Sequence, residues 1–340
     1  MSRVFDSIDQ CIGDTPIIEL RHPLLPLQKK LFLKLELFNP TFSIKDRTAL
    51  GLIKKAFSTG ELQRGGLVIE STSGNLGKSL AMLGATMGFK VILVVDQKVS
   101  QTMINWCKAY GAEVCVVTEA DQWGGYQAAR IKKVKELLAL HKNAHWPNQY
   151  DNQANPEYHY AETANELLAL EFDSIFGAVS TGGHLTGIAR QLHSHKKGIE
   201  VIACDVAGSA IFGQPFKPYL LNGVGLAWKS ANTDLAEFDH ICNVADQDAI
   251  STCHSLAKNA GLLLGGSGGL VVFAAMSYLL QDHANQALAI IADSGINYLH
   301  QIYDDEWLAQ HGVTILENQQ LSNRLQHFLF KKNQVMVNEF

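Results

Sequence analysis

Residues 67–96 read LVIESTSGNLGKSLAMLGATMGFKVILVVD, and this stretch decides the fold class. The apolar run Leu67–Glu70 predicts a strand, and the Gly- and Ser-rich run Ser71–Gly77 predicts a turn. A helix over Ser79–Met87 then leads into a second strand over Lys90–Val95. Two strands joined by a helix form a βαβ unit, whose strands pair in parallel while the helix covers the sheet. The stretch therefore predicts an α/β fold.

A second βαβ unit is predicted further along the chain. Its first strand covers Ser174–Val179, and a turn over Ser180–Gly187 leads into a helix that ends near His193. The returning strand covers Glu200–Cys204, and a further apolar run, Ala287–Ala292, predicts another strand. The parallel sheet is thus expected to recur in a second part of the molecule.

The predicted elements divide the chain into two lobes and an extension. A helix over Ser100–Tyr110 and a strand over Glu113–Thr118 continue the first βαβ unit, which makes it a small lobe of its own. The extension is rich in Gln and Asn and is expected to carry one amphipathic helix over Leu321–Phe330. The predicted small mobile lobe covers 41–145. The predicted large cofactor-binding lobe combines 1–40 with 146–316, and the predicted extension covers 317–340.

Composition points to a protein that acts on small molecules. The chain has 340 residues, 47% of them hydrophobic, and 28 Lys and Arg against 33 Asp and Glu, a net charge of −5. This make-up is typical of globular proteins, and the length suggests about two domains. Nucleic-acid-binding proteins carry clustered Lys and Arg, which this sequence lacks, so we expect no nucleic-acid partner.

Several other classes of site are not predicted. The six cysteines are far apart with no C-x-x-C pair, and the thirteen histidines form no H-E-x-x-H pattern, so no metal site is expected. The uncharged stretch 259–281 contains five glycines, which favours a buried turn and helix over a membrane span. The first residues lack the layout of a secretory signal, and we therefore expect a cytoplasmic protein.

The first candidate motif is the segment 39–47, Asn-Pro-Thr-Phe-Ser-Ile-Lys-Asp-Arg, which follows a predicted strand and opens a helix. A lysine at a helix start lies at the positive end of the helix dipole, and burial there would lower its pKa further. Both effects favour the neutral amine that forms a Schiff base, so Lys45 is a candidate nucleophile. An ordinary surface lysine is the alternative interpretation.

Three further turns follow predicted strands, where open α/β sheets bind their ligands. Residues 70–77 and 180–187 carry hydroxyl groups and backbone N–H groups suited to a carboxylate or a phosphate, although helix capping explains the first equally well. Gly182, Gly187 and Asp205 are also compatible with a dinucleotide site, but His184 occupies the place of the central glycine. In residues 293–298 the hydroxyl of Ser294 can bond a ring nitrogen, with a local turn as the alternative.

Taken in this order, the motifs resemble the fold-type II pyridoxal-phosphate enzymes of the cysteine synthase family. The resemblance rests on G-D-T-P at 13–16, the lysine segment 39–47, T-S-G-N at 72–75 and T-G-G at 181–183. It implies a two-lobe architecture like that of tryptophan synthase β, in which each lobe is a mostly parallel sheet with helices on both faces. It also implies pyridoxal 5′-phosphate as cofactor, amino acids as substrates and a homodimer.

The resemblance implies a role for each matching residue. Lys45 would hold the cofactor and move protons at the substrate Cα, and Asn75 would bond the cofactor ring oxygen. The residues expected to hold the substrate carboxylate are Thr72, Ser73, Gly74, Asn75 and Gln149. The residues expected to hold the cofactor phosphate are Ser180, Thr181, Gly182, Gly183 and His184. Ser294 would face the pyridine nitrogen, and as a neutral donor it would favour β-elimination over transamination.

Within the family, several stretches are similar to enzymes that make N-(2-amino-2-carboxyethyl)-L-glutamate for diaminopropionate and siderophore biosynthesis. That activity is a β-replacement that joins O-phospho-L-serine and L-glutamate and releases phosphate. Arg130, Lys229 and Tyr150 are candidates for binding the two acidic substrates. Phe42, where Gly is common, and His184, where Thr is usual, depart from the family pattern. Cysteine synthase, a dinucleotide-dependent oxidoreductase and a cofactor-binding scaffold without turnover remain the alternatives.

Overall fold

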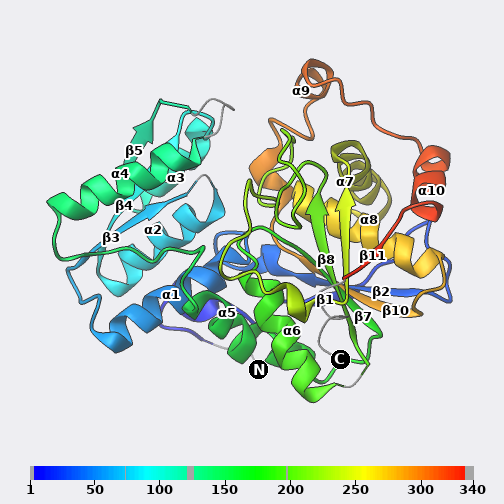
Figure 1. Ribbon diagram of the computed structural model, residues 1–340, viewed down its shortest axis with the longest axis horizontal. Coiled ribbons are helices and arrows are strands. Elements are labelled where there is room, and N and C mark those ends of the chain that lie inside the picture. Colours follow the sequence, from blue (N-terminus) through cyan, green and yellow to red (C-terminus); the bar gives the residue numbers. More distant parts are fainter. Residues whose placement is uncertain (1–3, 73, 121–125, 197, 334–340) are drawn as a thin grey trace.

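Two sheets of mostly parallel strands form the framework of the computed structural model, which describes residues 4–72, 74–120, 126–196 and 198–333 (Figure 1). The smaller sheet is parallel throughout, in the order β5 (Glu113–Val117), β4 (Lys90–Asp96), β3 (Leu67–Ser71) and β6 (Ala144–His145). The larger sheet runs in the order β1 (Ile17–Glu19), β2 (Lys30–Leu35), β10 (Gln286–Ile291), β7 (Ser174–Ala178), β8 (Glu200–Val206), β9 (His240–Val244) and β11 (Lys331–Lys332). Its two edge strands, β1 and β11, are antiparallel to their neighbours.

Helices connect the strands and cover them. The α-helices are α1 (Lys45–Thr59), α2 (Asn75–Met87), α3 (Gln101–Ala109), α4 (Gln127–Leu140), α5 (Ala154–Tyr158), α6 (Gly183–His195), α7 (Asp246–Ala260), α8 (Gly266–Leu280), α9 (Asp305–Gln310) and α10 (Asn318–Gln326). Shorter helical turns are η1 (Ile8–Cys11), η2 (Glu36–Phe38), η3 (His159–Thr163), η4 (Asn165–Leu167), η5 (Leu235–Glu237) and η6 (Gly295–Tyr298).

Alternate residues of the strands pack on opposite faces of each sheet. In β10, Ala287 and Ala289 belong to the core that contains α8, whereas Leu288 packs with the core that contains α6. In β3, Val68 packs with α2 and Ile69 packs with α4. Parallel strands covered on both faces are apolar throughout, which is why these strands lack alternation in sequence. The predicted fold class, with helices on both faces of two mostly parallel sheets, is confirmed.

The two sheets draw their strands from separate parts of the chain. The smaller sheet lies entirely within 67–145, inside the range 41–145 expected for the smaller lobe. The larger sheet combines β1 and β2 with strands that begin at Ser174. The exact lobe boundaries stay a prediction.

Two helices begin earlier than the sequence predicts. Helix α2 begins at Asn75 and α6 at Gly183, so Gly77 and Gly187 lie inside helices instead of turns. A Cβ atom at Gly187 would lie 2.2 Å from the carbonyl oxygen of Pro156, and one at Gly77 would lie 2.9 Å from a methyl carbon of Thr72. Close packing of the helix starts therefore requires glycine, although glycine disfavours helices in isolation.

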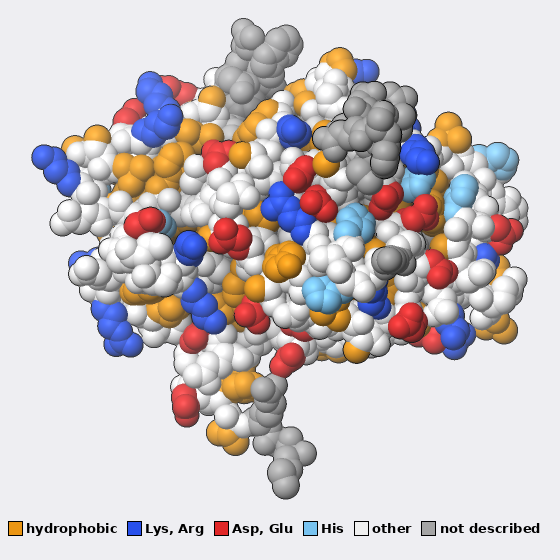
Figure 2. Space-filling model, turned by 60° about the horizontal axis from the view of Figure 1, so that its bottom comes forward, with side chains coloured by type: hydrophobic (Ala, Val, Ile, Leu, Met, Phe, Trp, Pro, Cys, Tyr) orange, Lys and Arg blue, Asp and Glu red, His pale blue; other side chains and the backbone are white. Residues whose placement is uncertain are grey.

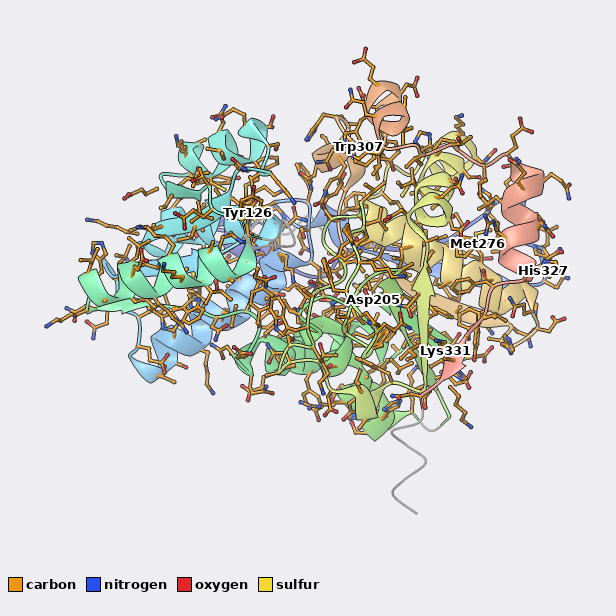
Figure 3. All side chains as sticks on the ribbon, turned by 45° about the horizontal axis from the view of Figure 1, so that its top comes forward. Tyr126, Asp205, Met276, Trp307, His327 and Lys331 are labelled. Carbon is orange, nitrogen blue, oxygen red and sulfur yellow. The ribbon has the colours of Figure 1, made fainter. Side chains whose placement is uncertain are left out.

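The described part of the C-terminal extension packs against the larger sheet and its helix α8. Helix α10 begins after Glu317, whose side chain and that of Gln320 form a capping box, and it ends at Gln326 instead of reaching Phe330. After His327 the chain turns to β11, which adds Lys331 to the edge of the sheet (Figure 3). Phe328 and Phe330 then pack against Phe273 and Tyr278 of α8, with ring centroids 5.1 and 4.9 Å apart.

The uncharged stretch 259–281 forms the end of α7, a short connection and the buried helix α8. Within the described ranges, no helix is both long and apolar enough to span a membrane. On the face of the molecule drawn in Figure 2, Lys and Arg side chains are interspersed with Asp and Glu. This mixed distribution agrees with the small net charge of the sequence.

Candidate active site

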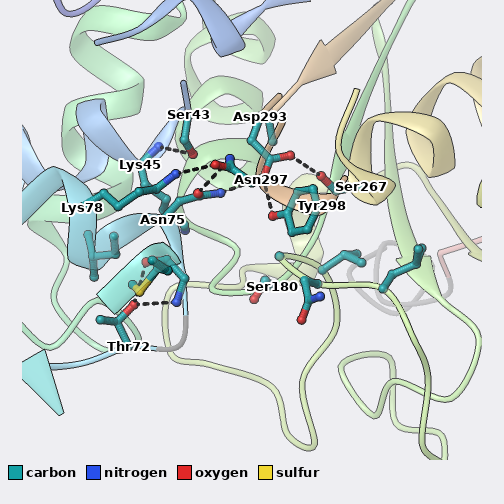
Figure 4. A pocket seen from close by; sticks show the side chains of 18 of the residues that line it. Ser43, Lys45, Thr72, Asn75, Lys78, Ser180, Ser267, Asp293, Asn297 and Tyr298 are labelled. Carbon is teal, nitrogen blue, oxygen red and sulfur yellow. Dashed lines mark hydrogen bonds between the residues drawn. The ribbon is translucent and has the colours of Figure 1, made fainter. Parts of the chain in front are cut away.

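A cavity of about 680 Å³ brings the predicted site residues together (Figure 4). Its wall is formed by the starts of helices and the ends of strands from both sheets. The predicted residues in this wall are Lys45, Thr72, Gly74, Asn75, Gln149, Ser180, Thr181 and His184. Gly182, Gly183 and Ser294 do not line the cavity themselves, and Ser73 lies outside the described residues.

Lys45 is the first residue of α1 and lines the cavity. Burial lowers the pKa of its amine to about 8, and the nearby carboxylate of Asp293 opposes part of this shift. The sequence anticipated the lowered pKa from burial and the helix dipole, and burial is its main cause here. A substantial fraction of the amine is therefore neutral near pH 8.

The segment before Lys45 is bonded to the end of strand β10. The N–H of Ile44 donates to the carbonyl oxygen of Ala292 at 2.8 Å, and the N–H of Ser294 donates to that of Phe42 at 3.2 Å. Phe42 has φ = +63°, a left-handed conformation that glycine adopts without strain. This conformation explains physically why the position suits Gly, and the Phe42 ring instead packs edge-on against Trp106.

A buried cluster of ion pairs holds the first turn of α1 in place. The guanidinium of Arg47 donates to Glu36 at 2.7 Å and to Glu166 at 2.6 Å, and Lys34 also bonds Glu166. Arg47 and Glu36 are 1% and 0% exposed. The two basic groups lower the pKa of Glu166 to about 2, so its carboxylate stays ionised. The cluster fixes the helix that presents Lys45.

Asn75 belongs to a network of side-chain hydrogen bonds that lies beside Lys45 in the cavity wall (Figure 4). Its Nδ2 donates to Asp293 Oδ2 at 2.6 Å, and the hydroxyl of Tyr298 donates to the same oxygen at 2.5 Å. The hydroxyl of Ser267, in the first turn of α8, lies 3.5 Å from Asp293 Oδ1. Burial raises the pKa of Asp293, although these donors oppose the shift.

The turn 180–184 forms a cradle at the start of α6. Gly182 has φ = +76°, and a Cβ atom there would lie 2.2 Å from Thr233 Oγ1. A Cβ atom at Gly183 would lie 2.2 Å from Asn155 Oδ1, so both positions require glycine. The free N–H groups of a helix start and the hydroxyls of Ser180 and Thr181 suit an anion, as the sequence indicated.

His184 is a neutral component of this turn. Burial lowers its pKa to about 3, with a further contribution from the charge of Lys45. Its ring lies 6.1 Å from that of His159, and its Nε2 has no hydrogen-bond partner among the described residues. A neutral imidazole still offers one N–H donor, so His184 remains compatible with an anion.

The dinucleotide interpretation loses its acidic residue. Asp205 ends strand β8 but does not line the cavity, and its Oδ1 accepts from the N–H of Val206 at 2.8 Å (Figure 3). Burial raises the pKa of Asp205 to about 7. Because Asp205 is fully buried and lies outside the cavity wall, its carboxylate does not reach a ligand hydroxyl there.

The two loops expected to hold the substrate carboxylate are joined by Glu70. One carboxylate oxygen accepts from Ser71 N at 2.7 Å and from Trp146 Nε1 at 3.1 Å, while the other accepts from Gln149 N at 3.4 Å. Burial raises the pKa of Glu70 to about 7. Thr72 Oγ1 accepts from the N–H of Gly74, which shapes the first loop.

Two of the three candidates for acidic substrates lie in the cavity wall. Arg130 is 6% exposed and has its Nη1 3.3 Å from Asp96 Oδ2, and Tyr150 lies nearby. Neither Nε nor Nη1 of Arg130 makes a well-formed hydrogen bond to a described residue. Lys229 is exposed and does not line the cavity.

Sequence reasoning assigned no role to several residues of the wall, among them Lys78, Ser267, Asp293 and Asn297. It expected Ser294 to face the ligand, but the hydroxyl of Ser294 accepts from Ile296 N at 3.3 Å at the start of η6. The available signal for Ser267 was its position in the run Leu-Gly-Gly-Ser-Gly-Gly at 264–269, which had been assigned only to the core. Among the described residues, no His, Cys, Asp and Glu side chains gather in a group suited to a metal ion.

Comparison with known proteins identifies the family. A family model described as pyridoxal-phosphate dependent enzyme matches residues 8–293. The chain belongs to this family. An N-(2-amino-2-carboxyethyl)-L-glutamate synthase of Ralstonia nicotianae is 38% identical over 308 residues, which are 89% of this chain and 91% of the relative. A synthase of the same name from Cupriavidus metallidurans is 37% identical and covers 90% and 92%.

Solved structures in the same fold family support the assignment. An O-acetyl serine sulfhydrylase isoform from Entamoeba histolytica has a TM-score of 0.85 at 31% identity, over 95% of this chain and 96% of its own. An O-ureido-L-serine synthase has a TM-score of 0.82 at 29% identity, over 90% and 100%. The chain is therefore a pyridoxal-phosphate-dependent synthase of the cysteine synthase type, and its reaction class is β-replacement on an amino acid.

The donor set of the cavity fits this cofactor. The cavity wall contains the Lys45 amine, whose pKa is lowered, and the amide of Asn75. The glycine-containing turn 180–184 contributes Ser180, Thr181 and His184 to the same wall. These are groups suited to an aldehyde, a phosphate and a ring oxygen. The prediction of pyridoxal 5′-phosphate is confirmed by the family.

Replacing Arg47 by Met should destabilise the protein strongly. The change leaves the carboxylates of Glu36 and Glu166 buried without their main partner, and removing one member of a buried ion pair costs about 3–5 kcal/mol. Urea unfolding measures the difference. Arg190→Met is the control, because Arg190 and its partner Asp234 are 38% and 39% exposed and such pairs contribute about 0.2–1 kcal/mol. Equal losses for the two variants would contradict the role of the cluster.

Covalent capture of pyridoxal phosphate by the apoprotein should accelerate with pH around a midpoint near 8. The Lys45 amine attacks an aldehyde only when neutral, and its lowered pKa makes the neutral form abundant at that pH. Stopped-flow absorbance after mixing measures the rate at each pH. Lys45→Ala should give no covalent capture, and a midpoint near the ordinary lysine pKa of about 10.4 would refute the burial argument.

Proposed function

We propose that the chain condenses O-phospho-L-serine with L-glutamate to give N-(2-amino-2-carboxyethyl)-L-glutamate and inorganic phosphate. The observation that carries this proposal is the charge of the cavity wall, where the described lining residues include Lys45, Lys78, Lys98 and Arg130 against the single carboxylate Asp293. The names of the two relatives in Ralstonia and Cupriavidus point to the same product. A cationic cavity in a chain of net charge −5 suits two anionic substrates.

The reaction requires one proton to leave Cα and one leaving group to depart from Cβ. Pyridoxal phosphate supplies an electron sink for the electrons released at Cα. Lys45 holds the cofactor and moves the proton, for which its lowered pKa is suited. The Cβ–O bond then breaks and phosphate leaves. The glutamate amine forms the Cβ–N bond and loses a proton, and Cα regains one.

The α-carboxylate of the first substrate would be held by Thr72, Gly74 and Gln149. Ser73, which lies outside the described residues, would belong to the same set. Glu70 supports this role, because it bonds the backbone of both loops and so keeps Ser71 and Gln149 at a fixed separation. Precise holding of the substrate lets the Cα–H bond face Lys45.

Ser180, Thr181, Gly182, Gly183 and His184 would hold the cofactor phosphate. For the pyridine nitrogen we propose Ser267 in place of Ser294, because Ser267 lines the cavity while the Ser294 hydroxyl is engaged with Ile296. The electronic argument is unchanged by this exchange. A neutral hydroxyl does not force protonation of the ring nitrogen, which favours elimination over transamination.

Arg130 and Tyr150 are the residues we assign to the acidic groups of the substrates. The guanidinium of Arg130 is buried beside the cavity with incompletely used N–H groups, an arrangement that favours a phosphate or a carboxylate. Lys229 is not part of the proposal, since it is exposed away from the wall. The homodimer implied by the family and the cytoplasmic location stay predictions.

Visible absorbance of the holoenzyme tests the function directly. O-Phospho-L-serine should change the cofactor band, and L-glutamate added to the same cuvette should restore it while the condensed product and phosphate appear. Lys45→Ala should not form product at the wild-type rate, and an unchanged rate would contradict the role of Lys45. Recovery of the band with sulfide but not with glutamate would overturn the proposed acceptor.

Cysteine synthase activity is the second candidate, because a sulfhydrylase from Entamoeba histolytica aligns over 95% of this chain. It uses sulfide as the acceptor, a small nucleophile without a carboxylate, and, with O-acetyl-L-serine, a donor whose ester group is uncharged until it departs as acetate. A comparison of kcat/KM for the four donor and acceptor pairs separates the two activities. Preference for O-acetyl-L-serine and sulfide would favour this candidate.

Arg130→Met should lower kcat/KM for O-phospho-L-serine and glutamate by at least about tenfold, because a buried anion would lose its charged donor. With O-acetyl-L-serine and sulfide the loss should be smaller. Arg130→Lys tests geometry, since an ammonium keeps the charge without the planar pair of donors. An equal loss for the two substrate pairs would contradict an ionic role toward the phosphate of the donor or the carboxylates of glutamate.

Ser267→Ala should change the visible spectrum of the bound cofactor and lower turnover, because the pyridine nitrogen would lose its hydrogen bond. Ser294→Ala is the matched control and should keep the wild-type spectrum, since its hydroxyl only caps a short helical turn. Spectra of both purified holoenzymes make the comparison. The reverse result would restore Ser294 to the ring nitrogen.

A further inference from the structure

Another lysine lies in the wall of the cavity, and beyond its positive charge it has no assigned part in the reaction described above. Lys78, on α2, is 2% exposed. Its Nζ donates to Asn297 Oδ1 at 2.9 Å and to the carbonyl oxygen of Thr41 at 3.4 Å, and it lies 4.6 Å from the centre of the Trp106 ring (Figure 4). Two oxygen acceptors and an aromatic face are the surroundings of a cation.

Burial of this cation is costly, so its retention requires a compensating interaction. Desolvation lowers the pKa of Lys78, and the charges that oppose the shift come from Asp293, in the turn after β10, and Asp46 on α1. An apolar side chain of similar length would avoid the cost. The contacts that distinguish Lys78 from such a side chain are those to Asn297, Thr41 and Trp106, and the hydrogen bond to Asn297 is the shorter of its two.

Asn297 links Lys78 to the amide of Asn75. Its Nδ2 lies 3.4 Å from Asn75 Oδ1, and Asn75 Nδ2 in turn donates to Asp293. The chain thus runs from Lys78 through Asn297 and Asn75 to Asp293. It joins α2, beside the smaller sheet, to the turn that follows β10 in the larger sheet.

The two end groups of this hydrogen-bond chain determine which group donates at each step. An ammonium group only donates hydrogen bonds and a carboxylate only accepts them. Asn297 must therefore turn its oxygen to Lys78 and its NH₂ group to Asn75, whose oxygen accepts and whose NH₂ group faces Asp293. An amide in isolation has two orientations of nearly equal energy, and here both ends of the chain select the same one.

The selected orientation also sets what the NH₂ group of Asn75 faces. An amide nitrogen carries two hydrogens: one is used in the bond to Asp293, and the hydroxyl oxygen of Tyr298 is the described acceptor near the other. A ligand oxygen in the cavity would take the place of Tyr298 as that acceptor. The opposite orientation would present an oxygen there, which would repel an ionised ring oxygen.

We propose that Lys78 is a positioning residue that fixes the amide of Asn75 through Asn297, so that Asn75 presents an N–H to the ring oxygen of the cofactor. The proposal rests on the role assigned to Asn75 in the proposed function. It explains how Asn75 is oriented for that role: Lys78 and Asp293, at the two ends of one hydrogen-bond chain, hold the Asn75 amide in place. Asn297 is the necessary intermediate.

The test compares the holoenzymes of Lys78→Met and Asn297→Ala with wild type. Each variant should weaken the affinity of the apoprotein for pyridoxal phosphate about tenfold and move part of the visible absorbance to shorter wavelength, because the ring oxygen loses a well-placed donor. Lys78→Arg, which retains a donor-only group, should restore most of both properties. The double variant should be no worse than either single variant, since both changes break the same chain.

Lys29→Met is the matched control. Lys29 is 7% exposed and donates to the carbonyl oxygen of Ala284 at 2.8 Å, and neither residue lines the cavity. Its replacement should affect unfolding and leave cofactor affinity and spectrum unchanged. If Lys78→Met fails to fold, Asn297→Ala carries the test, because Asn297 is only half-buried in a short turn.

Two results would overturn the proposal. One is wild-type affinity and spectrum in Asn297→Ala or Lys78→Met, and the other is an additive loss in the double variant. Both are distinct from failure of the proposed function, which would appear in the wild-type protein as turnover with a different donor or acceptor. If the wild-type enzyme condenses phosphoserine with glutamate but the variants keep wild-type cofactor affinity and spectrum, only the positioning role of Lys78 is refuted.

Discussion

The buried ion pairs of Arg47 with Glu36 and Glu166 are the constraint on which the rest of the site depends. These groups leave water only because their hydrogen bonds are nearly complete, and the geometry that completes them admits one position for the start of α1. Lys45 lies two residues before Arg47, so its amine is held against the ends of the strands. A single electrostatic arrangement thus determines where the nucleophile lies.

Around that fixed lysine, the fold brings together helix starts from both lobes. Helices α2 and α6 begin at Asn75 and Gly183, each directly after a strand end, and their N–H groups point toward the cavity region. Glycine at Gly182 and Gly183 permits the close approach of neighbouring loops that gives the phosphate cradle its shape. The cavity is consequently suited to anions by its backbone as well as by its lysines.

The charges within the cavity differ from those of the whole molecule. A chain with net charge −5 concentrates cationic side chains in its cavity wall and opposes them with Asp293. Asp293 raises the pKa of both Lys45 and Lys78 while burial lowers it. Its carboxylate also accepts from Asn75 and Tyr298. One buried carboxylate therefore connects the nucleophile, the cofactor-binding amide and the second lysine.

The sequence by itself determined the α/β class and the candidate Lys45, because strand periodicity and strand-to-turn motifs are local signals carried by neighbouring residues. The cofactor and the candidate Asn75 followed from the resemblance of those motifs to a known family. Tertiary structure decided the helix starts at Asn75 and Gly183, where packing against Thr72 and Pro156 overrides the tendency of glycine to form turns. It also decided which serine lines the cavity and that Lys78 is joined to Asn297. Those contacts link residues separated by more than two hundred positions, and no local pattern encodes them.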